Sequence, residues 1–169
     1  MAPSEWLGAG LARALFYPTL LYTVLRGMLN GPGHRAWYHR IDGTVLLGAL
    51  PLRSLTRKEW KNVGVEQLRL STVDMLGIPT LANLQKGVQF ALKYRSLGQC
   101  VYVHCKAGRS RSATMVAAYL IQVHNWSPEE AIKVITSIRS HIHITNGQLE
   151  VLREFYKANS PNVTHQSLT

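Results

Sequence analysis

The segment around Cys105 is the part of the sequence whose residue types and spacing best support chemistry. A short β-branched and aromatic run at 101–103 predicts a strand, and the apolar run at 113–122 predicts a helix after it. The turn between them leaves backbone N–H groups unpaired at the positive end of the helix dipole, which is a binding site for an anion. A thiol at such a place ionises more readily than a free one, whose pKa is about 8.5. The sequence therefore predicts a thiolate, Cys105, beside a site for an oxyanion.

Other residues of the same loop suit a phosphate ligand. Arg111 lies in the first turn of the predicted helix. Because helical side chains lean toward the N-terminus, its guanidinium is expected to return to the loop and hold two phosphate oxygens. Gly108 lets the backbone approach an oxyanion closely. Ser112 either donates a hydrogen bond to the sulfur or caps the helix, and Lys106 and Arg109 either bind further substrate charge or are solvated.

A thiolate that attacks a phosphate ester expels an alkoxide, which a nearby carboxylic acid can protonate. Asp74 is the only acidic residue between Glu66 and Glu129, an interval that also holds seven lysines and arginines. It lies in a predicted loop after a predicted strand, at the sheet edge where the carboxyl ends of parallel strands meet. We therefore expect Asp74 to be the general acid and then the base that activates water. The alternative is an aspartate that only stabilises a turn.

The predicted elements alternate strands with helices. Two short strands between Trp37 and Pro51 are joined by the hairpin dipeptide Asp42-Gly43, and the alternating residues 65–70 predict a further strand. The segment that begins at Ser127 has the pattern of a capping box. Helices are predicted over residues 54–62, 80–98, 113–122, 127–139 and 147–157. This order is typical of an α/β layer fold whose ligand binds at the carboxyl ends of the strands.

Composition narrows the choice of partners. The chain has 169 residues, of which 46% are hydrophobic, and carries a net charge of +10, which together predict one globular domain with an acidic partner. Without a long basic run or an aromatic–basic repeat, nucleic acid is the least favoured partner. Cys100 and Cys105 would bracket one strand and point to opposite faces, which disfavours a disulfide and indicates a reducing compartment. The seven scattered histidines form no ligand cluster, so we expect neither a metal nor a cofactor.

The first 35 residues form a distinct segment. Its apolar centre, 14–25, is shorter than the roughly 20 residues that a membrane-spanning helix needs. An amphipathic mitochondrial transit or membrane-surface helix fits its composition, which includes arginine and almost no acid; a secretory signal and a helix packed on the domain are the alternatives. We expect a catalytic domain at 36–159 and a loose polar tail at 160–169. The apolar side chains that recur at helical spacing are Leu7, Leu11, Leu15, Pro18, Tyr22, Leu25 and Leu29.

Residues 104–112 resemble the signature loop of the cysteine-dependent protein tyrosine and dual-specificity phosphatases. Residues 37–42, 46–51, 71–79 and 126–131 further resemble one branch of that family, the mitochondrial phosphatidylglycerophosphate phosphatases. The resemblance covers nearly the whole chain. It implies a dual-specificity phosphatase fold, with a short, mostly parallel sheet flanked by helices. It also implies Cys105 as the nucleophile, Asp74 as the general acid, and Arg111 as a phosphate ligand together with the backbone amides of Lys106, Ala107, Gly108, Arg109 and Ser110.

The same resemblance implies a substrate and a location. The reaction would convert phosphatidylglycerophosphate to phosphatidylglycerol, a step toward cardiolipin, at the matrix face of the inner mitochondrial membrane. The partners would be an anionic phospholipid and the membrane surface. The sequence does not define an oligomeric state.

One departure from that branch concerns the residues after Arg57. In the branch, a strand and an acidic, tyrosine-containing loop precede the segment that matches Trp60, whereas here Arg57 runs directly into Lys58-Glu59-Trp60. We expect that an internal segment is missing, which leaves about four strands and unpaired backbone groups that cost roughly 1–3 kcal/mol for each buried one. Two alternatives stay open: a phosphoprotein or phosphoinositide phosphatase, and a catalytically impaired splice-type isoform that only binds phosphate or membranes.

Overall fold

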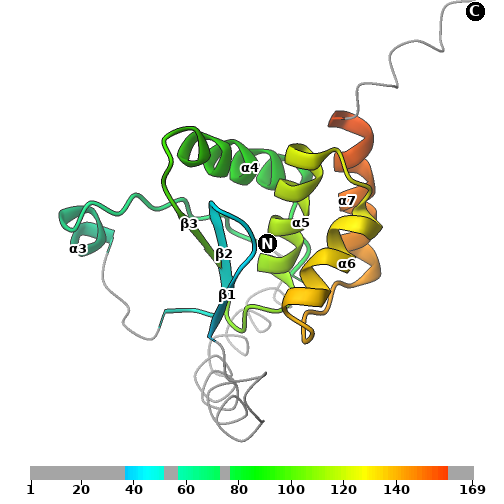
Figure 1. Ribbon diagram of the computed structural model, residues 1–169, viewed down its shortest axis with the longest axis horizontal. Coiled ribbons are helices and arrows are strands. Elements are labelled where there is room, and N and C mark those ends of the chain that lie inside the picture. The colour runs from blue at the N-terminus through cyan, green and yellow to red at the C-terminus, as the bar shows by residue number, and fades with distance from the viewer. Residues whose placement is uncertain (1–36, 52–56, 73–76, 160–169) are drawn as a thin grey trace, which may run out of the picture.

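The computed structural model describes residues 37–51, 57–72 and 77–159. Figure 1 shows the helices within residues 81–159 gathered on one side of a small sheet, with the helix at residues 57–62 standing apart from the body of the molecule. The expected α/β architecture is therefore confirmed. The elements in chain order are β1 (Tyr38–Arg40), β2 (Val45–Gly48), α3 (Arg57–Asn62), α4 (Leu81–Ser96), β3 (Val101–His104), α5 (Arg111–His124), α6 (Pro128–Ile138) and α7 (Asn146–Asn159).

The described sheet has three strands in the order β1-β2-β3. β1 pairs with β2 in the antiparallel sense, and β2 pairs with β3 in the parallel sense, with Val45 opposite Val101. The predicted hairpin turn forms at Asp42, whose Oδ1 accepts hydrogen bonds from the amides of Thr44 at 2.8 Å and Val45 at 2.7 Å. The sheet is thus mixed, with one parallel and one antiparallel pair, and is narrower than the expected four strands.

The strand predicted at residues 65–70 is wrong. These residues are irregular, and all but Leu70 are exposed. The segment still lies along α4, because the Glu66 carboxylate accepts hydrogen bonds from Lys93 and Tyr94 and the Ser71 carbonyl accepts one from Asn83. A strand requires a neighbour to satisfy its backbone groups. In the described sheet β3 is an edge strand, and residues 65–70 form no ladder with it.

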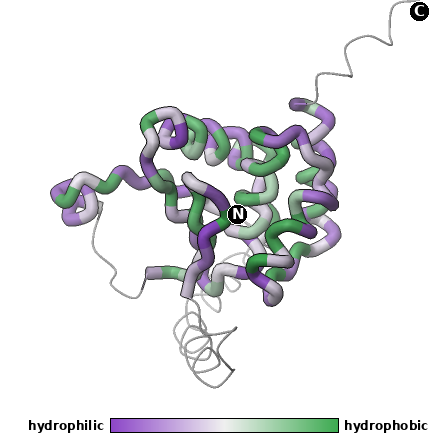
Figure 2. Tube along the Cα trace, in the orientation of Figure 1, coloured by the Kyte–Doolittle hydropathy of each residue, from purple (hydrophilic) through white to green (hydrophobic). Residues whose placement is uncertain are grey.

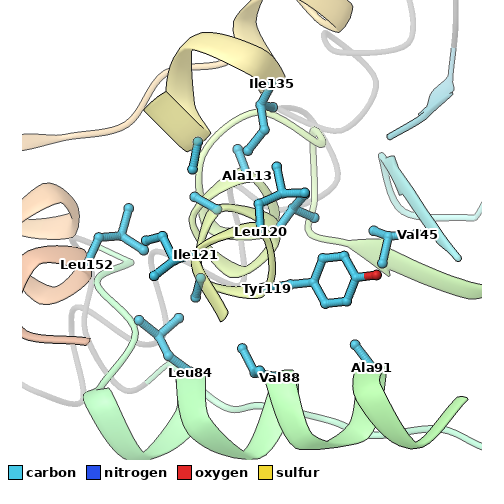
Figure 3. Close-up of a cluster of buried hydrophobic side chains, with 14 of the residues drawn as sticks. Val45, Leu84, Val88, Ala91, Ala113, Tyr119, Leu120, Ile121, Ile135 and Leu152 are labelled. Atoms are coloured by element: carbon cyan, nitrogen blue, oxygen red, sulfur yellow. The ribbon is translucent and has the colours of Figure 1, made fainter. Parts of the chain in front are cut away.

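Helix α5 is the centre of the hydrophobic core. Figure 3 shows its side chains packed between the sheet, α4, α6 and α7. In Figure 2 hydrophobic and hydrophilic residues alternate along the outer helices, as expected for elements that bury one face. Helix α7 buries Leu152 as expected, together with Phe155, whereas Leu149 and Tyr156 are half-buried. The other buried core residues include Val45, Leu47, Leu84, Val88, Ala91, Val116, Ala117, Leu120, Ala131 and Ile135.

The helix starts follow local signals in the sequence. The Thr80 hydroxyl caps α4 by accepting from the Asn83 amide at 3.2 Å, and Ser127 and Glu130 form the predicted capping box ahead of α6. Helix α5 begins at Arg111, two residues earlier than predicted, so Arg111 and Ser112 lie in its first turn. None of the described helices combines the length and the apolar character that crossing a bilayer requires. The predicted segments 1–35 and 160–169 lie outside the described residues, as does Asp74.

Candidate active site

The loop that joins β3 to α5 is packed tightly against the end of β2. It begins at Cys105, directly after β3, and ends at Ser110, the residue before α5. The Lys106 carbonyl accepts a hydrogen bond from the Leu50 amide at 3.3 Å. Gly108 has a φ of +65°, and a Cβ there would collide with the backbone of Gly48. Only glycine fits this position without strain, and here the close approach is to the backbone of β2.

The sulfur of Cys105 lies among hydrogen-bond donors. Its Sγ is 3.2 Å from the Ser112 Oγ. Burial raises the pKa of the Cys105 thiol, but the Ser112 hydroxyl and the backbone amides of Ser112, Arg109 and Gly108 together lower that pKa below its usual value. Two roles were considered for Ser112, a hydrogen bond to the sulfur and a cap on the helix. The geometry matches the first, because Ser112 lies inside α5. The capping position is occupied by Ser110, whose own side chain makes no capping bond.

Two cations lie beside this loop. Arg111 is exposed, and its Nη1 donates to the Thr72 Oγ1 at 3.2 Å, so the guanidinium contacts the loop that precedes α4. A Cβ on Gly77 would lie 3.1 Å from the Arg111 Cδ, so both described ends of that loop approach the arginine. Burial and the charge of Arg111 lower the pKa of Lys106. An anion at this place would relieve the repulsion between the two cations.

The Gln148 side chain connects the loop that begins at Cys105 with the loop that precedes α4. The side chain is fully buried, and its Oε1 accepts from the Ser110 hydroxyl at 3.0 Å and from the Thr145 amide at 3.1 Å. Its Nε2 donates to the Gly77 carbonyl at 3.1 Å. Gly77 follows Asp74 by three residues, so Gln148 anchors one end of the segment in which the predicted general acid stands. Gln148 was not among the residues predicted from the sequence.

Arg139 is a second residue that was not predicted from the sequence. Only 2% of it is exposed, and its Nε donates to the Gly108 carbonyl at 2.8 Å. Its Nη1 donates to the Nδ1 of His39, also at 2.8 Å, and burial and the Arg139 charge lower the pKa of His39. A signal was present, because Ala131, Ile135 and Arg139 share one helical face and the first two are buried. Arg139 thus holds the carbonyl of a residue whose amide lies near the Cys105 sulfur.

The remaining predicted loop residues contribute backbone rather than specific side-chain contacts. Ala107 is half-buried between Lys106 and Gly108, and the Arg109 carbonyl accepts from the His143 amide at 2.9 Å.

Both cysteines are free, with Cys100 exposed. Within the described ranges, no cluster of His, Cys, Asp or Glu has the arrangement of a metal site. The reactive groups of this site are therefore one sulfur, its amide and hydroxyl donors, and the neighbouring cations.

Comparison with known proteins identifies the family. Residues 49–158 match the family model described as "Dual specificity phosphatase, catalytic domain", a range that includes the Cys105 loop and the segment around Asp74. The chain belongs to the dual-specificity phosphatase family. The predicted fold and the predicted class of enzyme, a cysteine-dependent phosphatase, are confirmed.

Several dual-specificity phosphatases of known name resemble the whole chain. A rat protein named "Phosphatidylglycerophosphatase and protein-tyrosine phosphatase 1" is 70% identical over 184 aligned positions, which cover 93% of this chain and 95% of the relative. The human protein of the same name is 67% identical, with 93% of this chain and 92% of that one covered. An Arabidopsis thaliana "Phosphatidylglycerophosphate phosphatase PTPMT1" is 35% identical over 89% of this chain and 50% of its own length.

A solved dual-specificity phosphatase structure matches the fold. The crystal structure of PTPMT1 in complex with PI(5)P is 65% identical in sequence and superimposes with a TM-score of 0.72, covering 73% of this chain and 96% of the other. The alignment with the rat relative has 184 positions, whereas this chain has only 169 residues in total. The relative therefore contains residues that this chain lacks, in agreement with the expected missing segment and the three-stranded sheet.

Proposed function

We propose that this chain hydrolyses the phosphate monoester of an anionic phospholipid through a phosphocysteine intermediate. The observation that supports the proposal most directly is the placement of the Cys105 sulfur, 3.2 Å from the Ser112 hydroxyl and within reach of loop amides that lower its pKa. The same donors suit the equatorial oxygens of a transferring phosphoryl group.

In the first step the Cys105 thiolate attacks the phosphorus, and the bond from phosphorus to the ester oxygen breaks. Asp74, in its acid form, gives its proton to the leaving alkoxide, which departs as an alcohol. The amides of residues 106–110 and the Arg111 guanidinium bind the phosphoryl oxygens. Arg111 stands at the start of α5, from which its side chain can turn from Thr72 to an anion in the loop.

In the second step the Asp74 carboxylate takes a proton from water, and the resulting hydroxide attacks the phosphocysteine. The phosphorus–sulfur bond breaks, orthophosphate leaves, and the sulfur departs as a thiolate. The Ser112 hydroxyl stabilises the charge that develops on this sulfur, because the two atoms already lie 3.2 Å apart. Neither step uses a metal ion or a cofactor.

The substrate we favour is phosphatidylglycerophosphate, which the reaction converts to phosphatidylglycerol on the way to cardiolipin. Three named relatives, from rat, human and Arabidopsis thaliana, support this choice, together with the net charge of +10, which suits an anionic lipid at a membrane surface. The crystal structure of PTPMT1 in complex with PI(5)P favours a phosphoinositide as the second candidate substrate. Phosphoproteins remain a third, since the rat and human names also include protein-tyrosine phosphatase.

We further propose that the chain acts at the matrix face of the inner mitochondrial membrane. The amphipathic, nearly acid-free composition of residues 1–35 supports this location. A fluorescent reporter fused to these residues should accumulate in mitochondria. A diffuse or secretory distribution would contradict the location without affecting the proposed chemistry.

The missing segment favours a second function, that of an impaired isoform that binds phosphate or membranes without turnover. The three-stranded sheet and the surplus of aligned positions in the rat relative support it. Against it, the Cys105 loop keeps both its packing against β2 and its contacts with Ser112, Gln148 and Arg139.

Turnover of a small aryl phosphate by the purified full chain separates the two functions. We expect hydrolysis that continues in excess chelator and falls at least about a thousandfold in Cys105→Ser. Vanadate binding without turnover would instead establish the impaired isoform. Comparing phosphatidylglycerophosphate and phosphoinositide in liposomes with phosphotyrosine peptides then ranks the substrates, and a preference for the peptides would contradict the lipid assignment.

A further inference from the structure

An apolar groove lies on the face of the sheet opposite the core. Leu47 and Val103 pack into the core, and side chains alternate along a strand, so Leu46 and Tyr102 point to the other face. There they line an open groove of about 450 Å³ together with Trp37, Tyr38 and Pro51. Tyr38 is 55% exposed and meets the Tyr102 ring edge to face, with the ring centroids 6.3 Å apart.

The polar atoms of two of the groove's aromatic rings, Trp37 and Tyr102, bond to backbone carbonyls of the protein. The Trp37 Nε1 donates to the Leu50 carbonyl at 3.1 Å, and the Tyr102 hydroxyl donates to the Ala49 carbonyl at 2.6 Å. Burial raises the pKa of Tyr102 to about 12, so its hydroxyl stays protonated. The surface that remains is almost entirely ring carbon and aliphatic carbon, which favours an apolar occupant.

The groove is continuous with the phosphate-binding loop. Pro51 follows Leu50, whose amide donates to the Lys106 carbonyl at 3.3 Å. Tyr102 stands three residues before Cys105, and its ring packs across Gly48, where a Cβ would collide with it. The loop residue Gly108 packs on the backbone of the same Gly48. The groove lining and the loop that begins at Cys105 thus share contacts with the end of β2.

We propose that this groove receives the acyl-bearing part of the phospholipid whose phosphate binds at Cys105, so that the chain selects esters by their apolar tail. The inference rests on the proposed function. It adds that the residues lining the groove determine which phosphate esters the chain prefers. Charge complementarity supports this occupant, because the cations Lys106 and Arg111 stand at the phosphate loop whereas none of the described residues that line the groove is charged. A single ligand with an anionic head and an apolar tail matches both surfaces at once.

The test compares phosphatidylglycerophosphates with acetyl, butanoyl and hexanoyl chains, kept at monomeric concentrations, with the same headgroup lacking acyl chains, glycerophosphoglycerophosphate. The measured quantity is the ratio of kcat/KM for each acylated ester to that for glycerophosphoglycerophosphate. In the full wild-type chain we expect the ratio to rise roughly two- to fourfold for each methylene that the groove buries. In Tyr38→Ser the hexanoyl ratio should fall about tenfold, and Tyr38→Phe, which keeps the ring, should restore it.

Leu97→Ser is the matched control, because Leu97 is 59% exposed and does not line the groove. It should keep the wild-type ratio. The inference would be overturned if the ratio did not rise with chain length, or if it rose equally in Tyr38→Ser. The groove would then belong to another occupant, such as the residues that precede Trp37. If the wild-type chain hydrolysed no ester at all, including an aryl phosphate, the proposed function itself would fail and this inference with it.

Discussion

At the scale of single residues, the ionisation of Cys105 decides whether the loop can act as a nucleophile. Burial alone would keep the thiol protonated, and the lowered pKa results from donors that outweigh it. Because only the thiolate attacks phosphorus or an alkylating reagent, the pH dependence of alkylation reports the pKa of this one group. The donors can therefore be tested one at a time.

Replacement of Ser112 by alanine should move the pH midpoint for alkylation of Cys105 by iodoacetamide upward, because the thiolate loses its side-chain donor. Turnover should slow about ten- to a hundredfold, since a hydrogen bond to a charged group contributes about 1.5–3 kcal/mol. Ser137→Ala is the matched control, because the Ser137 hydroxyl bonds only a helix carbonyl on an exposed surface. An unchanged midpoint in Ser112→Ala would exclude the assigned role.

Arg139 should act as a positioning residue through Gly108. In Arg139→Met the Gly108 carbonyl loses its donor, the loop amides move away from the sulfur, and we expect kcat/KM to fall about a hundredfold while the alkylation midpoint rises. Arg139→Lys keeps the charge and should restore part of both.

Arg153→Met serves as the control for Arg139, because Arg153 forms an exposed pair with Glu129 at 2.8 Å. Circular dichroism should show that each variant is folded. A loss of stability in Arg139→Met with no change in the alkylation midpoint would indicate a purely structural role.

At the scale of elements, Asp42 joins the hairpin to the helices. Its Oδ1 accepts two turn amides, and its Oδ2 accepts from the Tyr119 hydroxyl at 2.8 Å and lies 3.7 Å from the Arg95 guanidinium. Burial raises the pKa of Asp42, but the turn amides, the Tyr119 hydroxyl and the Arg95 charge together hold it below its usual 3.8. The sequence predicted the turn at Asp42 but not these bonds to α4 and α5.

Because the folded-state pKa of Asp42 is lowered, its stabilisation is complete above pH 3.8 and is lost as the pH falls through the lowered value. Asp42→Asn should therefore reduce the free energy of unfolding by about 1–2 kcal/mol near neutral pH and weaken its acid dependence. Urea unfolding at several pH values measures both, with the exposed Glu150→Gln as control. An acid dependence as steep as that of the wild type would contradict the assignment.

Local signals explain what the sequence predicted well among these elements. Thr80 and Ser127 begin their helices through bonds to residues three positions on, and Asp42-Gly43 closes a hairpin between adjacent strands. The prediction of a strand at 65–70 failed because pairing depends on a partner that is distant in sequence, and these residues form no ladder with the described sheet. Arg139 and Gln148 were missed for a related reason, because both bond residues that are distant in sequence. The partners of Arg139 are 31 and 100 positions away, and two partners of Gln148 are 38 and 71 positions away.

At the scale of the whole molecule, the described sheet leaves one edge of β3 unpaired. Figure 1 shows α3 standing out from the body, with the chain that follows it leading back to the body. The residues after α3 expose apolar side chains, with Val63 at 64% and Val65 and Leu68 at 42% each. An open edge near exposed apolar residues promotes association between chains.

Replacing both Val65 and Leu68 by lysine should suppress concentration-dependent association, measured by light scattering, at unchanged turnover of an aryl phosphate. Charged side chains oppose the burial of this exposed segment against another chain. Gln67→Lys adds the same charge at a polar position of the same segment and should have a much smaller effect. Equal association in the double variant, Gln67→Lys and the wild type would show that this surface does not drive self-association.

The proposed mechanism requires that the phosphoryl group pass through Cys105. The most direct measurement is peptide mass spectrometry after the purified chain has been mixed with an aryl phosphate and quenched in acid during turnover. We predict one phosphoryl group on the peptide that contains Cys105, and none on the corresponding peptide of Cys105→Ser. Turnover with an unmodified Cys105 peptide, or a phosphoryl group on a different residue, would contradict the proposed mechanism.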